Sequence, residues 1–221
     1  MLQGVIFDLD GVIVDSHPAH QRAWRAFFDS LGREVSDDQL SFVLEGRKRE
    51  DILRHFLGDL TSEQVKHYGE RKEALFRDNA AALKVIPGIC GLLNDLRDVG
   101  LPAAAASSAR RGRVIAMLEQ LGLTSHFKAV VAGDDVVNGK PDPAIFNIAA
   151  QGINVDAECV LVCEDSAAGI RAAKNAGMRC LGIATDGRRA TLLEAGADHV
   201  LPDFTSVRVR DLRQMFATHN A

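Results

Sequence analysis

Short apolar segments alternate with amphipathic helical segments along most of this chain, and this alternation constrains the fold more than any other feature. The apolar, strand-like runs are residues 4–7, 102–106, 129–132, 158–163, 178–183 and 199–201. The segments with helical spacing are residues 88–99, 113–121, 143–151, 166–176, 188–194 and the region after Ser206. Parallel strands need crossover connections, which helices usually supply. The pattern therefore predicts a three-layer α/β fold, in which helices cover both faces of a parallel sheet.

A long helical segment separates the first strand from the other strands and helices. Residues 16–82 show helical periodicity, abundant charge and almost no strand signal. Three helices are indicated there, around Trp24, around Ile52 and around Tyr68. We predict a core domain formed by residues 1–15 and 83–221, and a small helical bundle formed by residues 16–82. An insert that leaves directly after the first strand would lie over the carboxyl edge of the sheet as a cap, where ligands bind in such folds.

Composition narrows the class of protein. Of 221 residues 47% are hydrophobic and 25% charged, and the formal net charge is −4, so collagen-like, disordered and strongly basic nucleic-acid-binding classes are not favoured. The first residues show no charged leader followed by a long apolar stretch, and no apolar run reaches the roughly 20 residues needed to cross a bilayer. The four cysteines form no C-x-x-C pair and indicate no disulfide framework. We expect a cytoplasmic protein, with no nucleic-acid or membrane partner and a monomer as the default.

Two carboxylates follow the first strand. Asp8 and Asp10 lie two residues apart, and Gly11 beside them lets the backbone approach a ligand. One aspartate at such a place can attack phosphorus while the other delivers a proton to the leaving oxygen, with Mg²⁺ reducing the charge repulsion. The pair alone is equally compatible with a turn and a helix cap.

Three more polar clusters follow later strands. Ser107 could hold phosphoryl oxygens together with the amide of Ser108, or it could cap the next helix. Lys140 lies between Gly139 and two prolines, where it is either a fixed point charge for a phosphoryl group or a solvated loop lysine. Glu164 and Asp165 end an apolar strand; their oxygens suit Mg²⁺, although Asp165 could also cap the following helix.

Taken together, the segments FDLDGVIVDS, AASSARRG, GKPDPAIF and LVCEDSAAGIRAAKNAG resemble the four motifs of the haloacid dehalogenase-like superfamily. The resemblance covers essentially the whole chain and implies a Rossmann-like core. It also implies that Asp8 is the nucleophile that forms an aspartyl-phosphate and that Asp10 is the general acid and base, with its main-chain carbonyl on Mg²⁺. Ser107 and Lys140 would bind the transferring group. Asp8, Asp10 and Asp165, with Glu164 directly or through water, would form the metal site.

The insert resembles the helical cap of the subgroup that contains beta-phosphoglucomutase and sugar-phosphate phosphatases. His20, Arg49 and Lys72 match positions where that mutase has a histidine, a phosphate-binding arginine and a cap lysine, although each is also typical of a solvated helix face. Glu45 stands where a lysine is expected, and Arg110 or Arg111 could form a substitute phosphate fork. The predicted substrate-binding residues are Gly11, His20, Gly46, Arg49, Lys72, Ser108 and Arg110.

Three functions follow from these observations. The first is a Mg²⁺-dependent phosphatase of a small phosphate ester such as a sugar phosphate, and the second is a phosphosugar mutase that excludes water under the cap. The third is a catalytically silent binding protein, which the retained Asp10, Lys140 and acidic metal ligands disfavour. In both enzymes Asp10 exchanges a proton near neutral pH, so we expect burial to raise its pKa.

Overall fold

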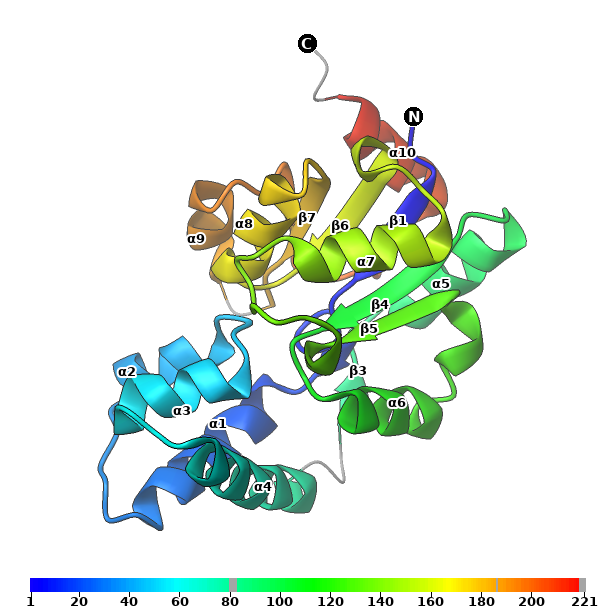
Figure 1. Cartoon of the computed structure of the whole chain (residues 1–221). Coiled ribbons are helices and arrows are strands. Elements are labelled where there is room, and N and C mark those ends of the chain that lie inside the picture. Colours follow the sequence, from blue (N-terminus) through cyan, green and yellow to red (C-terminus); the bar gives the residue numbers. More distant parts are fainter. Residues whose placement is uncertain (80–82, 186, 219–221) are drawn as a thin grey trace.

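The structure is a computed structural model, and it describes residues 1–79, 83–185 and 187–218. Among these residues, parallel strands form a six-stranded sheet in the order β5-β4-β1-β6-β7-β8 (Figure 1). The strands are β1 (Gly4–Phe7), β4 (Ala103–Ser107), β5 (Ala129–Ala132), β6 (Val160–Glu164), β7 (Arg179–Ile183) and β8 (His199–Leu201). The predicted α/β fold with a parallel sheet is therefore confirmed.

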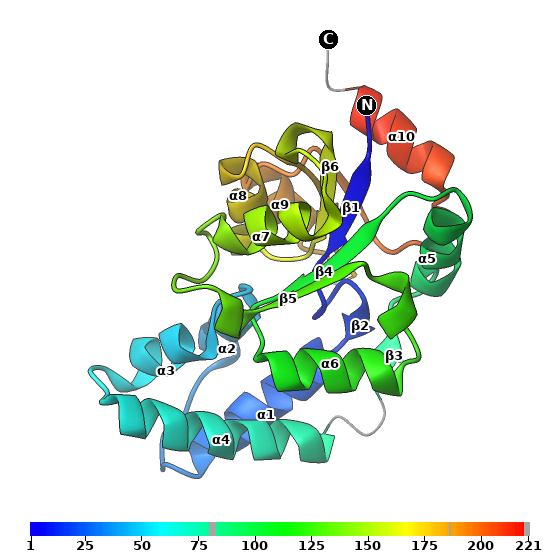
Figure 2. The same cartoon turned by 45° about the vertical axis from the view of Figure 1, so that its right-hand side comes forward.

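Helices cover both faces of this sheet, as Figures 1 and 2 show. They are α5 (Ile89–Asp98), α6 (Arg111–Gln120), α7 (Ala144–Ile153), α8 (Ala167–Asn175), α9 (Arg189–Glu194) and α10 (Val209–Ala217). The alternation of side chains along β1 divides the core: Val5 and Phe7 pack with α5, α6 and α10, whereas Ile6 packs with α7, α8 and α9. Short 3-10 helices complete the connections: η1 (Phe42–Leu44), η2 (Thr124–His126), η3 (Gly133–Asp135) and η4 (Ala157–Cys159).

The insert after the first strand is helical, as predicted. Its helices are α1 (His17–Asp29), α2 (Asp37–Ser41), α3 (Arg49–Leu57) and α4 (Ser62–Asn79). They lie together at one end of the sheet (Figure 1) and enclose an apolar cluster of their own, centred on Trp24, Phe27, Phe28 and Leu53. Aromatic edge and stacking contacts join these rings, which gives the small cap a core independent of the sheet.

A two-stranded antiparallel sheet, which the sequence analysis did not predict, lies where the chain enters and leaves the cap. β2 (Val14–Asp15) pairs with β3 (Lys84–Val85), so the two connections to the cap are held side by side (Figure 2). The short helix α2 was also not predicted. The domain boundary at 15/16 stays a prediction, and the one at 82/83 involves residue 82, which lies outside the described residues.

The register of the sheet places three of the four polar clusters together. Phe7 at the end of β1 pairs with Ala105 of β4 and with Cys163 of β6, and the amide of Asp8 donates to the carbonyl of Cys163 at 3.0 Å. Because parallel strands end at the same edge, Asp8, Ser107 and Glu164 meet beneath the cap. In the described part of the chain, no helix is long and apolar enough to span a membrane.

Candidate active site

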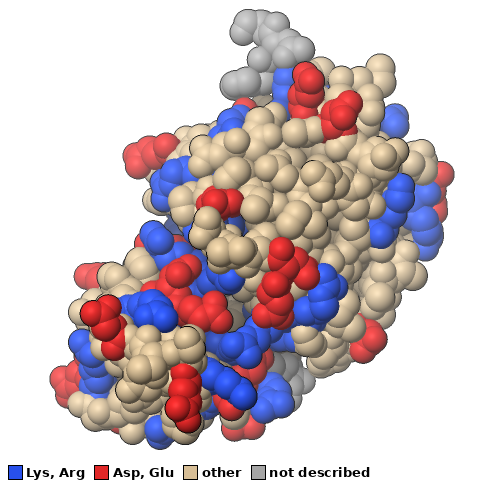
Figure 3. All heavy atoms as spheres, in the orientation of Figure 1, with Lys and Arg blue, Asp and Glu red and all other residues tan. Residues whose placement is uncertain are grey.

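A cavity of about 340 Å³ lies between the carboxyl edge of the sheet and the helical cap. Lys, Arg, Asp and Glu side chains gather along this junction on the face shown in Figure 3. The predicted site residues that line the cavity are Asp8, Asp10, His20, Gly46, Arg49, Lys72, Ser107, Ser108, Arg110 and Asp165. The other three, Gly11, Lys140 and Glu164, do not line it but lie against residues that do. Motifs separated by more than 100 residues thus converge on one site.

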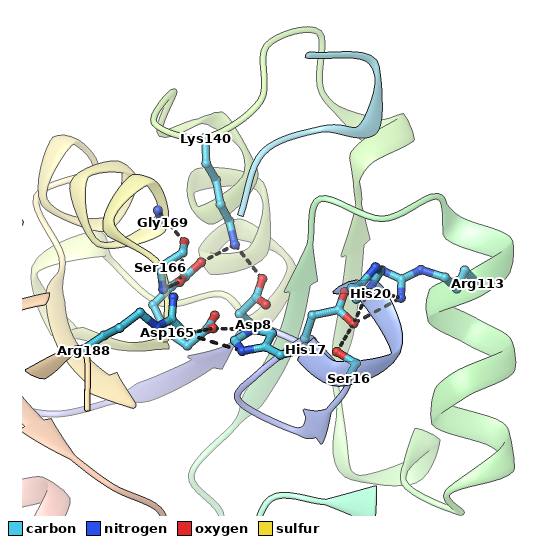
Figure 4. A network of polar contacts seen from close by, with 12 residues as sticks. Asp8, Ser16, His17, His20, Arg113, Lys140, Asp165, Ser166, Gly169 and Arg188 are labelled. Carbon is cyan, nitrogen blue, oxygen red and sulfur yellow. Dashed lines mark hydrogen bonds and ion pairs between the residues drawn. The ribbon is translucent and has the colours of Figure 1, made fainter. Parts of the chain in front are cut away.

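Lys140 lies behind the cavity wall, between the carboxylates of Asp8 and Glu164. Its Nζ is 2.5 Å from Asp8 Oδ1 (Figure 4) and 2.5 Å from Glu164 Oε1, and all three side chains are buried. Burial lowers the pKa of Lys140, but Asp8 and Glu164 outweigh it and hold that pKa above its ordinary value. The interpretation of Lys140 as a solvated loop lysine is therefore wrong: it is a fixed cation beside Asp8.

Glu164 is held on both oxygens. Oε1 faces Lys140, whereas Oε2 accepts from the amide of Ser166 at 2.7 Å and from its hydroxyl at 2.9 Å. Ser166, and not Asp165, caps α8, because its Oγ accepts from the amide of Gly169. A Cβ on Gly169 would lie 1.8 Å from Glu164 Oε1, so glycine is required for the carboxylate to lie against the helix.

Asp165 faces the cavity from the other side of Asp8. Its Oδ2 lies 2.7 Å from His17 Nε2 and 3.3 Å from Arg188 Nη2 (Figure 4). Burial lowers the pKa of His17, but its hydrogen bond to Asp165 raises it above the ordinary value. Gly11 has φ of +77°, and a Cβ there would lie 2.3 Å from Asp165 Oδ2. Gly11 therefore makes room for Asp165 rather than for the cavity.

These carboxylates suit a divalent cation. Oxygens of Asp8, Glu164 and Asp165 all lie within 4.8 Å of one another, and hard oxygen ligands are those that Mg²⁺ prefers. Burial raises the pKa of Asp8 well above its ordinary value; Lys140 opposes this rise, and Glu164 and Asp165 add to it. These three carboxylates face the ammonium of Lys140 and the guanidinium of Arg188, and a divalent cation would compensate the remaining negative charge, so the residues present fit Mg²⁺.

The two serines after β4 have different partners. Ser107 is buried, and its Oγ accepts from the amide of Ala109 at 3.1 Å instead of capping α6, whose N-cap is Arg110. The hydroxyl of Ser108 crosses the junction and donates to the carbonyl of Gly46 in the cap at 2.6 Å. In this conformation Ser108 thus joins the core to the cap.

Asp10 is surrounded by hydrogen-bond donors. Arg113 reaches both of its oxygens, with Nη2 2.5 Å from Oδ2 and Nη1 3.1 Å from Oδ1. Ser16 Oγ donates to Oδ1 at 2.6 Å, and His20 Nε2 lies 3.3 Å from it. Burial raises the pKa of Asp10, but Arg113 and His20 outweigh it and hold that pKa well below its ordinary value. The expectation of a raised pKa is therefore wrong for this conformation, because the guanidinium stabilises the carboxylate.

Two cap residues form a buried polar pair behind Asp10. Lys72 Nζ donates to His20 Nδ1 at 2.9 Å and lies over the rings of Trp24 and Phe76, 5.2 and 4.9 Å from their centroids. Burial lowers the pKa of Lys72 to about 7, with Arg113 adding to the effect. Burial and Lys72 lower the pKa of His20 to about 3, so His20 is neutral at physiological pH. Neither residue belongs to a solvated helix face.

Two more of the predicted substrate-binding residues, Arg49 in the cap and Arg110 in the core, bring positive charge to the cavity wall. Arg49 Nη1 is 3.5 Å from Glu73 Oε2, while its buried Nε has no hydrogen-bond partner among the described residues. Arg110 is 3.6 Å from Glu50. Glu45, at the position where a lysine is expected, does not line the cavity and pairs with Arg47 at 3.0 Å. A glutamate at this position therefore does not change the charge of the cavity wall. Arg111 likewise turns away, toward Asp135.

Sequence analysis missed Arg113, His17 and Arg188. Residue 113 was predicted only as the first residue of a helical segment, with no role in the site, whereas the structure pairs Arg113 with Asp10. A signal was available: Arg113 lies four residues before the buried Met117, on the same side of α6. No comparable signal marks Arg188, which reaches Asp165 from the loop after β7.

Comparison with known proteins agrees with this geometry. The family model described as haloacid dehalogenase-like hydrolase matches residues 5–183, and the chain belongs to this family. The phosphorylated carbohydrates phosphatase of Thermotoga maritima is 35% identical over 212 residues, which cover 89% of this chain and 92% of that protein. The beta-phosphoglucomutase of Bacillus subtilis is 34% identical over 192 residues, covering 82% and 83%.

A solved structure shows the same fold. The crystal structure of beta-phosphoglucomutase from Clostridium difficile superposes with a TM-score of 0.85 at 25% identity, covering 99% of each chain. Named relatives thus include a phosphorylated carbohydrates phosphatase and a beta-phosphoglucomutase, and the chain is a haloacid dehalogenase-like enzyme similar to both.

Proposed function

We propose that this protein is a Mg²⁺-dependent phosphatase of a small phosphorylated metabolite of the sugar-phosphate class, and that it works through an aspartyl-phosphate on Asp8. The observation that carries the proposal is the position of Asp8: it opens into the cavity, beside the fixed cation Lys140 and two further carboxylates. A nucleophilic carboxylate needs such neighbours to approach a phosphate dianion.

In the proposed reaction an oxygen of Asp8 attacks phosphorus, and the bond between phosphorus and the ester oxygen breaks in line with the attack. Ser107 and Lys140 bind the phosphoryl oxygens, and Asp10, once protonated, transfers its proton to the leaving oxygen. Its pairing with Arg113 favours the ionised Asp10, which is the form that the second step uses as a base. Asp10 then removes a proton from water, which attacks phosphorus, releases inorganic phosphate and restores Asp8. Asp8 and Asp165, with Glu164, would hold Mg²⁺, which when bound would neutralise charge on the phosphoryl group.

The cap would provide the substrate contacts. Arg49 and Lys72 line the cavity from the cap, and Arg110 lines it from the core at the start of α6. A cavity of about 340 Å³ is of the size that small metabolites occupy. Relatives named for phosphorylated carbohydrates and for validoxylamine A 7'-phosphate support a phosphorylated, hydroxyl-rich substrate. A cytoplasmic, monomeric enzyme without nucleic-acid or membrane partners stays our prediction.

One observation favours a second candidate, the phosphosugar mutase. His20, Arg49 and Lys72 all line the cavity from the cap, and a cap that closes over the cavity would exclude water after the first transfer. The mutase would return the phosphoryl group from Asp8 to a second sugar hydroxyl instead of to water.

Phosphorus NMR separates the two candidates. The purified protein is incubated with Mg²⁺, beta-glucose 1-phosphate and a trace of glucose 1,6-bisphosphate. Inorganic phosphate that grows in proportion to lost ester is the expected result, whereas glucose 6-phosphate would establish the mutase. The same sample with Asp8→Asn should show no reaction; turnover by that variant would contradict both candidates.

A further inference from the structure

Arg113 lies in the first turn of α6, on the core side of the cavity, and its guanidinium contacts Asp10. Its two terminal nitrogens bind the two oxygens of Asp10 at 2.5 and 3.1 Å, and its side chain is only 12% exposed. A bidentate pair of this kind fixes the plane of a carboxylate as well as its distance. Arg113 therefore determines the orientation of Asp10 in a way that a single hydrogen bond does not.

The guanidinium of Arg113 is itself held by the cap. Its central carbon lies 4.9 Å from the ring centroid of Phe76 in α4, and its Nη1 shares Asp10 Oδ1 with His20 Nε2 in α1. The position of Arg113, and through it that of Asp10, thus depends on contacts from both sides of the cavity.

The other donors to Asp10 come from the same stretch of chain. Ser16 and His20 lie six and ten residues after it, and both contact Oδ1 only. Arg113 is 103 residues away and is the one described residue for which bonds to both oxygens are observed. It ties the loop after β1 to the core helix α6.

We propose that Arg113 is a positioning residue for Asp10, which places the proton-exchanging carboxylate at the correct point of the cavity when the cap is closed. This inference rests on the proposed function, because it assigns Arg113 a role in the proton exchange by Asp10. Misplacing a reacting group by about 1 Å can reduce a rate about 100-fold, so a residue that only orients Asp10 affects turnover strongly.

Two kinds of phosphate ester separate positioning from other roles. The leaving alkoxide of beta-glucose 1-phosphate needs a proton, whereas the p-nitrophenolate of p-nitrophenyl phosphate leaves without one. Single-turnover rates are measured with beta-glucose 1-phosphate, and the burst of p-nitrophenolate reports phosphorylation of Asp8 with the aryl ester. The variants are Arg113→Met, Arg113→Lys, Asp10→Asn and the double variant Asp10→Asn/Arg113→Met, each with Mg²⁺.

Arg111→Met is the matched control. Arg111 lies at the same helix start, carries the same charge and pairs with Asp135 away from the cavity. We expect its rates with both esters to stay within about twofold of the wild-type values, because exposed ion pairs contribute little.

For Arg113→Met we expect a loss of about 10- to 100-fold with the sugar phosphate at saturation, little change in KM, and less than about threefold loss in the p-nitrophenolate burst. Arg113→Lys should recover part of the loss. In the Asp10→Asn background the Arg113 substitution should have almost no further effect, because the two residues act as one unit.

Equal losses with both esters, a rise in KM alone, or losses that multiply in the double variant would overturn the positioning role. If Arg113→Met does not fold, judged by its melting temperature, Arg113→Lys in both backgrounds provides the same test. Asp8→Asn separates this inference from the proposed function. Turnover by Asp8→Asn would contradict the proposed function. If Asp8→Asn is inactive but the losses of Asp10→Asn and Arg113→Met multiply in the double variant, only the role of Arg113 is contradicted.

Discussion

The ammonium of Lys140 lies 2.5 Å from Oδ1 of Asp8, across 132 residues of sequence and with almost no exposure to solvent. The contact brings the loop before α7 to the end of β1. The same ammonium also donates to Oε1 of Glu164. A buried cation shared by two carboxylates is stable only while all three groups are present, so this relationship is important for folding as well as for chemistry.

Replacing Lys140 should therefore destabilise the protein. Lys140→Met leaves Asp8 and Glu164 buried without a cation, and breaking a buried pair in this way costs about 3–5 kcal/mol. Urea denaturation measures the difference. The control is Arg97→Met, which removes an exposed pair with Asp98 and should change stability by less than about 1 kcal/mol. A Lys140→Met protein as stable as wild type would show that the pair has no structural role.

Gly169 is expected to tolerate no side chain. In Gly169→Ala the new Cβ would meet the Glu164 carboxylate at 1.8 Å, so Glu164 and Lys140 have to shift. We expect a loss of about 1–3 kcal/mol of stability and a clear loss of turnover. Gly91→Ala in α5 has open space around its Cβ and should be neutral or slightly stabilising. Equal melting temperatures and activities for the two variants would contradict this account.

Lys72 should make stability depend on pH in a specific direction. Its pKa is lowered to about 7 by burial, against about 10.4 in an unfolded chain. Between these values the unfolded state binds more protons, so the cost of burying Lys72 is complete below about pH 7 and fades as the pH rises toward 10. Lys72→Met should therefore be more stable than wild type at about pH 6, and the advantage should shrink toward about pH 10.

The measurement is urea denaturation at several pH values, with Lys66→Met as control because Lys66 is an exposed lysine of the same helix. The control should follow the wild-type profile. A Lys72→Met protein that is less stable than wild type at about pH 6 would contradict the claim that burying Lys72 costs stability and lowers its pKa.

Ser108 should hold the cap against the core. Ser108→Ala removes the hydrogen bond to the carbonyl of Gly46, worth about 1 kcal/mol, and leaves the fold of each part unchanged. Amide hydrogen exchange should become faster around Gly46 and Arg47. Ser41→Ala, which removes an exposed hydroxyl bonded within the cap, is the control and should leave this exchange unchanged. Unchanged exchange in Ser108→Ala would show that other contacts close the cap.

Much of the fold follows from the sequence. The bounds predicted for β1, β5 and β8 match the structure because each is a short apolar run ended by polar or turn residues. The pair β2 and β3 was missed because two-residue strands show no periodicity. Their pairing depends on where the cap leaves and rejoins the core, which is a tertiary contact that local sequence does not encode.

The site was predictable where a motif follows a strand, as with Asp8, Ser107 and Glu164. It was not predictable where a side chain reaches its partner from elsewhere. Arg113 is a charged residue in a charged run, and its burial against Phe76 depends on how the cap closes. The lowered pKa of Asp10 has the same origin, since burial alone would raise it and Arg113 reverses the sign.

The central claim is that Asp8 receives the phosphoryl group. The most direct measurement is rapid acid quenching of the enzyme with Mg²⁺ and p-nitrophenyl phosphate, followed by digestion and mass spectrometry of the peptide that contains Asp8. The account predicts one added phosphoryl group on Asp8, which persists longer in Asp10→Asn and is missing in Asp8→Asn. Phosphate release with no label on Asp8, or with the label on another residue, would contradict it.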